Sequence, residues 1–382
     1  MTTLQTPIRS ILIANIRLIG DVVLTTPLIG LFRQLFPGAA IDFLVNRGTG
    51  EFLEKDPRVR RVIYSEKWQQ GHSGGAGGYL MTIAGRYDLA VCLNPSDRGT
   101  LATVLAGRRV RLGFYEPEKP LGTFWRKLLL SHALPYDQEL HPVARCGQIA
   151  QLVGAERGPL PVAVHWDQSD GVAVADTLTQ GGADSGYFVV HPFARWRYKY
   201  WDIHRFCAVS DRVAQRYGLH PVWTSSPDPD EVAQVREAAA RCAVAPLVVP
   251  GSFSLNRMAC LLQGARLYLG LDTAITHIAA AVGTPLVALY GPTEIWRWHP
   301  WDNATLPENQ LSTGYRGAYR SGNVVALQTA CEHYPCIRPG CYREGSENPC
   351  LMAIGAEEVC VEVGRLVQSG CVQIERQDVR EP

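Results

Sequence analysis

Short apolar segments alternate with helix-like segments along this chain, and the alternation starts again after residue 186. In the first half we expect strands at 8–16, 41–45, 59–64, 87–93 and 110–114, and a helix at 22–36. In the second half we expect strands at 187–191, 221–224, 247–249, 267–271 and 286–290, and helices at 203–217, 255–263 and 273–282. Short buried strands separated by helices are typical of a parallel sheet that is covered on both faces.

The stretch between the two halves has a different composition. Residues 155–186 contain Pro159 and Pro161 and end in a Gly-Gly-Ala-Asp-Ser-Gly run, so we interpret them as the connection between two domains. The sequence thus predicts two doubly wound, Rossmann-like α/β domains with parallel sheets, at 1–165 and 166–382. In such folds ligands bind beyond the carboxyl ends of the strands, and here we expect them in the cleft between the domains.

The charged residues nearly cancel, since 37 Lys and Arg against 36 Asp and Glu leave a formal charge of +1. A dedicated nucleic-acid-binding protein normally has a clear basic excess, so this total argues against nucleic acid as a partner. The halves differ, however, because residues 1–165 hold 19 basic and 13 acidic side chains, and residues 166–382 hold 18 and 23. This asymmetry suggests different partners for the two halves.

The N-terminus resembles neither a signal peptide nor a transit peptide. No uncharged run reaches the ~18 residues that a membrane-spanning helix needs. We therefore expect a cytoplasmic protein, at most peripheral on a membrane surface.

Six of the eleven cysteines lie near the C-terminus: Cys331, Cys336, Cys341, Cys350, Cys360 and Cys371. Four residues separate Cys331 from Cys336, and four separate Cys336 from Cys341. This spacing is at the limit for zinc-binding cysteine pairs, and it is not accompanied by a second such pair elsewhere. A metal site, a disulfide and a loop with incidental thiols all stay open, so these cysteines have no assigned role. The five others are scattered, mostly in apolar segments, and are typical of reduced core residues.

The first expected strand leads into the sequence Asn-Ile-Arg-Leu-Ile-Gly-Asp, which ends at Gly20 and Asp21. One glycine is too few for a dinucleotide-binding turn, which argues against a nicotinamide-dependent oxidoreductase. Asp21 has two interpretations. It can cap the following helix, which is worth about 0.5–2 kcal/mol, or face the cleft as a general base.

A polar turn between a strand and a helix of small residues runs from Gly270 to His277. The free N–H groups at such a helix start suit a phosphate or diphosphate, and the hydroxyls of Thr273 and Thr276 can add donors. His277 can reach the same anion or pack structurally. The alternative is a core helix that is simply capped by Asp272.

Three cations lie close together after the first strand of the second half: Arg195, Arg197 and Lys199. A cluster of this kind on a strand-to-helix loop suits an anionic ligand. After the next strand, Asp228 lies in an acidic turn that can accept hydrogen bonds from a ribose.

Two motifs occur together in this chain. The first is the segment 19–27, with the sequence Ile-Gly-Asp-Val-Val-Leu-Thr-Thr-Pro, and the second is the segment 270–293, which runs from Gly-Leu-Asp-Thr to Gly-Pro-Thr. This pairing resembles glycosyltransferase family 9, the ADP-heptose:lipopolysaccharide heptosyltransferases. The segment Arg-Trp-Arg-Tyr-Lys-Tyr-Trp at 195–201 is more narrowly similar to the heptosyltransferase III branch. The likeness covers most of the chain, from Ile11 to about Thr293.

The resemblance implies the GT-B fold and an inverting, metal-independent transfer of heptose from ADP-heptose, without a cofactor. By this resemblance Asp21 is the general base that deprotonates the acceptor hydroxyl, and Lys199 neutralises the departing diphosphate. The residues matched to the donor site are Gly20, Arg195, Asp228, Phe253, Asp272, Thr273, Ala274 and His277. Alanine at 274 replaces a glycine of many relatives and would be strained if φ there were positive. Phe253 stands where some relatives have methionine near the adenine, and an aromatic ring can stack there.

The resemblance also implies an anionic acceptor, the inner core of lipopolysaccharide at the cytoplasmic face of the inner membrane. The basic side chains that could attract it are Arg58, Arg60, Arg61, Arg108, Arg109 and Arg111, with Arg126 and Lys127. The alternative is that most of these are ordinary solvated charges. The glycine-rich segment 71–78 is an acceptor lid or an insertion, and Trp296, Trp298 and Trp301 are a sugar platform or packing anchors.

Two other functions stay open at this point. The same fold can use another nucleotide-sugar donor or a protein acceptor, or the chain can be a non-catalytic nucleotide-sugar-binding scaffold. The presence of both Asp21 and Lys199 argues against the scaffold, because a pure binding protein needs no base.

Overall fold

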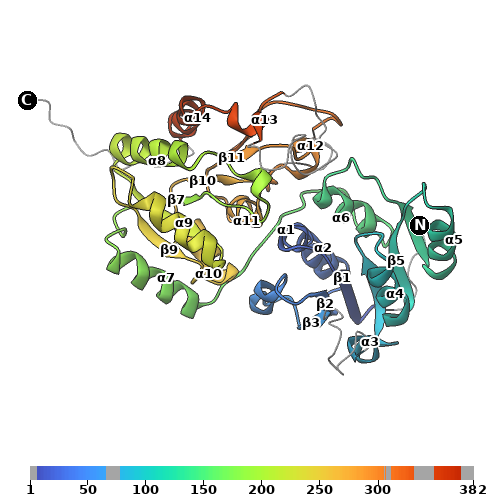
Figure 1. The fold of residues 1–382 in the computed structure, drawn as a ribbon. Helices are drawn as coiled ribbons and strands as arrows, with labels where there is room; N and C mark the ends of the chain where they lie inside the picture. Colours follow the sequence, from blue (N-terminus) through green and yellow to red (C-terminus); the bar gives the residue numbers. More distant parts are fainter. Residues whose placement is uncertain (1–6, 66–77, 305, 307–310, 331–347, 371–382) are drawn as a thin grey trace, which may run out of the picture. The chain divides into compact units, whose positions relative to one another are not determined.

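The computed structural model divides the chain into two compact units (Figure 1). The first falls within Met1–His165 and Thr305–Gln310, and the second within Trp166–Ala304 and Leu311–Pro382. The residues that the structure describes are 7–65, 78–304, 306, 311–330 and 348–370. The acceptor-binding and donor-binding roles expected of the two halves stay predictions at this stage.

The first unit is built on a six-stranded sheet in the order β3-β2-β1-β4-β5-β6. Its neighbouring strands run parallel to one another. The strands are β1 Ser10–Asn15, β2 Ala40–Asn46, β3 Arg61–Ser65, β4 Tyr87–Cys92, β5 Gly107–Tyr115 and β6 His132–Pro135. The helices are α1 Ile19–Val23, α2 Pro27–Leu35, α3 Gly78–Ile83, α4 Asp97–Ala106, α5 Pro120–Leu129 and α6 Pro142–Gln151, with a 3-10 turn at Glu51–Lys55.

The second unit has a seven-stranded sheet in the order β12-β13-β11-β10-β7-β8-β9. The short edge strand β12 is antiparallel to β13, and the other pairings are parallel. The strands are β7 Tyr187–His191, β8 His220–Ser225, β9 Leu247–Pro250, β10 Tyr268–Leu271, β11 Leu286–Tyr290, β12 Tyr319–Ser321 and β13 Val324–Gln328. The helices are α7 Gln168–Gln180, α8 Ile203–Tyr217, α9 Pro229–Ala239, α10 Leu255–Gly264, α11 Ala274–Ala281, α12 Ile295–Trp298, α13 Pro349–Met352 and α14 Ala356–Gln368, with a 3-10 turn at Arg197–Lys199.

The expected pair of parallel-sheet α/β domains is confirmed, and the helix at 203–217 has the bounds that its pattern predicts. Phe206, Val209 and Val213 are buried on one face of α8, and Gly218 ends the helix in the left-handed conformation, at φ 66°. Helix α14 lies beside α8 (Figure 1).

The expected single helix at 22–36 is wrong, because two helices, α1 and α2, occupy this stretch. The break lies at Thr25 and Thr26, whose hydroxyls donate to the carbonyl oxygens of Asp21 and Val23 at 2.7 and 2.8 Å. Pro27 then starts α2, since a proline has no N–H to continue the first helix.

The interpretation of 155–186 as a plain connection is also wrong, since α7 occupies much of it. Asp167 and Asp170 form a reciprocal capping box at the start of α7. Val174 and Leu178 are buried and lie four residues apart, on the side of the helix that packs near α10. Most polar side chains of this helix lie on its other faces, while Asp170 is buried on the same face as Val174 and Leu178.

Several expectations fall outside the described residues. These are the roles of residues 71–77 of the glycine-rich segment and of Cys331, Cys336, Cys341 and Cys371. Cys350 is buried in α13, and Cys360 is half-buried in α14. Among the described residues, no helix has the length and apolar character to cross a membrane.

Candidate active site

The order of the strands identifies one edge of each sheet as a ligand site. In the first unit, β2 and β4 lie on opposite sides of β1. In the second unit, β8 and β10 likewise lie on opposite sides of β7. In open α/β sheets ligands bind at such switch points, outside the carboxyl ends of the strands. Asp21 follows β1, Lys199 follows β7 and Asp272 follows β10, so each of them lies at this edge of its own sheet.

Asp21 lies in the first turn of α1 and is not the helix cap, because the N-cap position belongs to Leu18. Its carboxylate is one-fifth exposed, and its Oδ1 atom lies 3.7 Å from Nε of Arg17. The structure therefore removes the N-cap interpretation and leaves a carboxylate that solvent can reach at the carboxyl edge.

A buried amide network holds the backbone of Asp21 in place. Asn15, the last residue of β1, donates from Nδ2 to the carbonyl oxygen of Asp21 at 3.0 Å and to Oγ1 of Thr25 at 2.6 Å. Asn94, which follows β4, donates to Oδ1 of Asn15 at 3.2 Å. Asn15 and Asn94 were not among the residues that the sequence predicted for the site. Their position directly after neighbouring strands was the available signal.

In the second unit, Lys199 and Asp272 form an ion pair with 2.5 Å between Nζ and Oδ2. Their side chains are 18% and 7% exposed. Burial by itself raises the pKa of Asp272, but the ammonium of Lys199 outweighs this effect and holds the pKa below its ordinary value. Burial lowers the pKa of Lys199, and the Asp272 carboxylate raises it above its ordinary value. Both groups are charged at neutral pH, so the pair places a half-enclosed cation at the carboxyl edge.

His277 lies one turn into α11 and is 4% exposed. Burial lowers its pKa to about 4, so the ring is neutral at pH 7. Its Nδ1 atom has no hydrogen-bond partner among the described residues. A buried ring nitrogen without a protein partner, beside a helix start, suits a polar ligand atom.

The remaining residues of the predicted donor turn have distinct environments. Thr273 is the N-cap of α11, and its hydroxyl caps no N–H of that helix. Ala274 begins the right-handed helix, so its alanine side chain brings no strain. The hydroxyl of Thr276 is buried and donates to the carbonyl oxygen of Leu271, so the expected role of Thr276 as an anion ligand is wrong.

The other predicted donor residues also follow strands at the carboxyl edge. Arg195 is exposed after β7, with its guanidinium 5.2 Å from the ring centre of Trp196. Asp228 follows β8 and caps α9, accepting from the N–H groups of Asp230 and Glu231. Phe253 is half-buried after β9. Gly20, in the first unit, is the second residue of α1. The structure thus gives Asp228 a capping role whatever its part in ribose binding.

For the three tryptophans, the sequence left a sugar platform and packing anchors as alternatives. Trp296 and Trp301 are 5% and 1% exposed, so they act as packing anchors. Trp298 is half-buried, with the guanidinium of Arg297 at 5.2 Å from its ring centre.

The arginines expected on the acceptor side lie mostly at the opposite, amino edge of the first sheet. Asp42, fully buried near the start of β2, accepts from Arg60 at 2.7 and 2.8 Å and from Arg61 at 3.2 Å. Arg108 and Arg109 lie near the start of β5 and pair with Asp88. Arg58 pairs with Asp56 before β3, and Arg111 lies in the middle of β5. These residues were selected from a count of charges per half. Such a count does not show at which edge of the sheet a charged residue lies.

Arginines that the sequence analysis did not select lie at the carboxyl edge instead. Arg17 lies between β1 and α1, and Arg47 directly follows β2. Arg98, in the first turn of α4, donates to the hydroxyl of Ser65, the last residue of β3. Their positions directly after strands could have identified them.

We expect Arg60→Gln to change the KM for an anionic acceptor by less than about twofold. The unfolding free energy should fall by about 1–3 kcal/mol, because the fully buried Asp42 loses the hydrogen bonds from Arg60 while Arg61 and Tyr87 still contact its carboxylate. Arg98→Gln, at the other edge, is the comparison variant. Steady-state kinetics on both variants measure the two KM values. A rise in the KM of Arg60→Gln beyond this range would show that the amino edge takes part in acceptor binding.

Three buried histidines predict an acid-sensitive second unit. Burial lowers the pKa of His191, His277 and His299 to about 4 each. The unfolded chain has an ordinary histidine pKa near 6.5, so it binds more protons than the folded state between the two values. The free energy of unfolding therefore has its full value above about pH 6.5. It falls as the pH drops towards 4, by about 4 kcal/mol per pH unit when all three histidines contribute.

Urea unfolding between pH 7 and pH 5 measures this slope. His191→Gln should reduce it by about one-third, and His204→Gln, on the exposed side of α8, is the matched control. An unchanged slope in His191→Gln would contradict the assignment.

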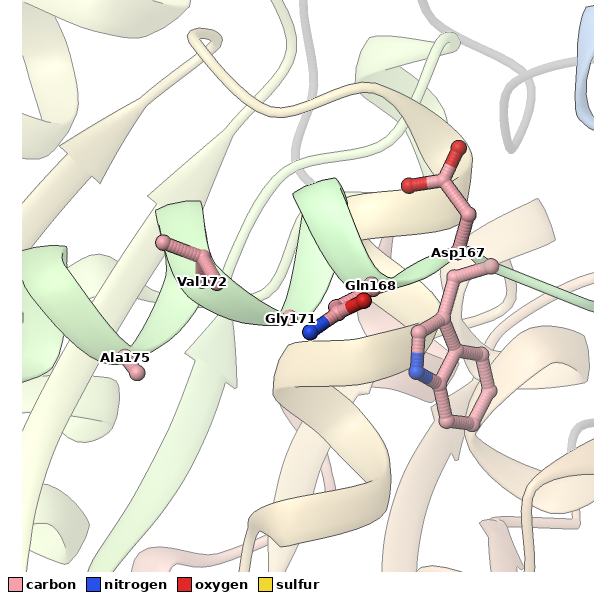
Figure 2. A pocket seen from close by; sticks show the side chains of 6 residues that line it. Asp167, Gln168, Gly171, Val172 and Ala175 are labelled. Carbon is pink, nitrogen blue, oxygen red and sulfur yellow. The ribbon is translucent and has the colours of Figure 1, made fainter.

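A shallow pocket lies at the first turns of α7 (Figure 2). It is lined by Trp166, Asp167, Gln168, Gly171, Val172 and Ala175. Oδ1 of Asp167 accepts from the N–H of Asp170 and from the hydroxyl of Ser169, so this carboxylate serves the helix start. None of the strand-end residues described above lines this pocket.

The model of glycosyltransferase family 9 (heptosyltransferase) matches residues 82–312. A lipopolysaccharide heptosyltransferase 3 from Escherichia coli is 30% identical over 289 residues, which cover 74% of this chain and 84% of the relative. Two solved E. coli structures are also similar, and each alignment covers 94% of this chain and 99% of the solved chain. They are the ADP-heptose lipopolysaccharide heptosyltransferase II, with TM-score 0.69 and 20% identity, and the heptosyltransferase WaaC with ADP-2-deoxy-2-fluoro heptose, with TM-score 0.66 and 19% identity.

These likenesses and the two parallel-sheet units identify the GT-B fold. The match to the family model covers more than half of the chain and reaches into both units. The chain therefore belongs to glycosyltransferase family 9, the heptosyltransferases.

Proposed function

We propose that this protein transfers heptose from ADP-heptose to a sugar hydroxyl of the lipopolysaccharide inner core, with inversion at the anomeric carbon and without a metal. The observation that carries the proposal is the group of charged and polar residues at the carboxyl edges of both sheets, in a chain of this family. The donor is supported by the relative whose structure contains an ADP-heptose analogue. The acceptor is supported by the relative named lipopolysaccharide heptosyltransferase 3.

On the donor side, Lys199 is the group proposed to receive the negative charge of the leaving ADP. As the bond between the anomeric carbon and the phosphate oxygen breaks, the diphosphate gains charge. Lys199 and the N–H groups at the start of α11 can stabilise that charge from fixed positions. The neutral ring of His277 is a hydrogen-bonding group for the same ligand. This arrangement is the basis for proposing a metal-independent reaction.

On the acceptor side, the carboxylate of Asp21 is the proposed general base. It takes the proton of the acceptor hydroxyl as that oxygen forms its bond to the anomeric carbon on the face opposite the leaving diphosphate, which inverts the configuration. We propose that Arg17, Arg47 and Arg98 attract the carboxylates and phosphates of the core, in place of the amino-edge arginines.

The test is a transfer assay with the purified protein. ADP-heptose and a series of truncated core acceptors are mixed with the enzyme, ADP release is followed, and the product is analysed by mass spectrometry and by NMR for its anomeric configuration. Transfer with inversion, unaffected by EDTA, supports the proposal. Absence of ADP release with every core acceptor would overturn it, and loss of activity with EDTA would overturn metal independence.

The same assay separates the alternatives. Transfer from another nucleotide sugar, or to a protein hydroxyl, would keep the fold and replace the substrates. Tight ADP-heptose binding with no turnover on any acceptor would indicate a scaffold. We further propose a cytoplasmic location with peripheral contact to the inner membrane, where a lipid-linked acceptor is available.

A further inference from the structure

Helix α5 presents its apolar side chains to solvent. Leu121 is 87% exposed, and Phe124 and Leu128 are each 69% exposed. Their spacing of three and four residues places them along one side of the helix. Among the described residues, twelve large apolar side chains are exposed, and four of them, these three and Leu129, belong to this ten-residue helix. We call Leu121, Phe124 and Leu128 the α5 stripe.

The buried side of α5 is polar, so the helix is reversed relative to an ordinary surface helix. Arg126 is 3% exposed, and its Nη2 atom donates to Asp97 at 2.6 Å and to the carbonyl oxygen of Pro95 at 2.5 Å. Thr123 is half-buried and donates to the carbonyl oxygen of Glu116 at 2.6 Å. These contacts fix the rotation of the helix, and the α5 stripe cannot turn inward without breaking the hydrogen bonds of the buried Arg126 guanidinium to Pro95 and to the exposed carboxylate of Asp97.

The charges of the helix itself are basic, while the exposed carboxylate of Asp97 beside it pairs with Arg126. The sequence of α5 contains Arg126 and Lys127 and no acidic residue. Lys127 is exposed, with Nζ at 4.3 Å from the ring centre of Tyr115. A bilayer with anionic lipids has an apolar interior and a negative surface, and it complements both features. Two copies that met through this helix would instead cover Lys127 of each copy without an acidic partner on the other α5.

The helix is tied to the edge of the sheet where the acceptor is proposed to react. Pro95, whose carbonyl accepts from Arg126, lies in the loop that follows β4. Asn94 in the same loop donates to Asn15, which in turn holds the backbone of Asp21. An external surface that α5 contacts would therefore lie near the carboxyl edge of the first sheet.

We propose that α5 is a membrane-docking helix, which buries the α5 stripe among the acyl chains of an anionic bilayer while Lys127 contacts the headgroups. The membrane contact stands on the exposure and charge of the helix. Its purpose, the presentation of a lipid-linked acceptor to Asp21, rests on the proposed function.

Cosedimentation with vesicles tests the docking. The full chain is mixed with vesicles of phosphatidylethanolamine and phosphatidylglycerol, or of phosphatidylcholine alone. The wild type should bind the anionic vesicles. Leu121→Ser, Phe124→Ser and Leu128→Ser combined should lower the partition coefficient by at least about tenfold. Lys127→Ser should lower it by about fivefold on anionic vesicles only.

The matched control replaces exposed apolar residues on other helices, Met81→Ser on α3 and Val361→Ser on α14, and should bind like the wild type. Absence of wild-type binding, or equal binding by the stripe variant, would overturn the proposal. Sedimentation velocity without vesicles provides a further check. A wild-type dimer that the stripe variant converts to a monomer would identify the stripe as a self-association surface and overturn membrane docking.

Kinetics separate this proposal from the proposed function. The stripe variant should keep its rate on a delipidated, water-soluble core acceptor and lose rate on the vesicle-bound acceptor. If the wild type used neither acceptor, the proposed function would fail, while the vesicle measurements would still decide the docking.

Discussion

Asp21→Asn should lower the rate of heptosyl transfer by about 10²–10⁴-fold while the ADP affinity changes by less than about twofold. An amide has nearly the shape of the carboxylate but cannot take the proton of the acceptor hydroxyl. The first turn of α1 should persist, because Asn15 and Thr25 hold the carbonyl oxygen of residue 21, and the substitution leaves that oxygen in place. Single-turnover kinetics measure the transfer step, and calorimetric titration measures ADP binding.

Asp184→Asn is the control, since it removes an exposed carboxylate from a loop of the second unit. It should transfer heptose like the wild type. A parallel loss of transfer, ADP affinity and thermal stability in Asp21→Asn would show that Asp21 supports the fold of α1 and is not the base.

Lys199→Met should lower the unfolding free energy of the second unit by about 3–5 kcal/mol and also weaken ADP binding. The substitution leaves the carboxylate of Asp272, which is 7% exposed, without its buried counter-charge. A loss of ADP affinity in this variant alone therefore does not separate a damaged fold from a missing ligand contact. Urea unfolding and calorimetric titration have to be measured together.

The double variant Lys199→Met/Asp272→Asn makes that separation. Removal of both charges should restore most of the stability, because no uncompensated ion stays buried. Its ADP affinity should stay below that of Asp272→Asn alone, in which the lysine is still present. Equal ADP affinity in the double variant and in Asp272→Asn would mean that Lys199 serves only to neutralise Asp272, and its assigned role with the diphosphate would be wrong.

The sequence predicted the strands and the longer helices well where local signals agreed. Helix α8 has buried residues at helical spacing, a capping Asp202 and a terminal Gly218, and its bounds were predicted correctly. Helix α7 was missed because its capping signal at Asp167 stands in a polar, glycine-rich stretch, where burial of Val174 and Leu178 against the rest of the unit decides the structure. Composition alone does not contain that tertiary contribution.

The candidate site was predictable as a set of strand-end residues but not as a set of contacts. Lys199 and Asp272 are 73 positions apart, and they meet because β7 and β10 are neighbours in the sheet. That adjacency depends on the strand order, which local patterns do not determine. The same limitation explains the arginines: Arg60 and Arg108 contribute to the basic total, but only the register of β3 and β5 shows that they pair with Asp42 and Asp88.

The ion pairs at the amino edge of the first sheet have a consequence for the evolution of this enzyme. Asp42 and Asp88 contribute to stability at one end of the strands, while Asn15, Asp21 and the loop of Asn94 lie at the other. Energetic effects of distant sites are nearly additive. Changes in the carboxyl-edge loops should therefore alter acceptor choice without changing the stability that the amino-edge ion pairs provide. With the proposed acceptor role of the first unit, its acceptor range can therefore change while the residues that secure stability stay the same.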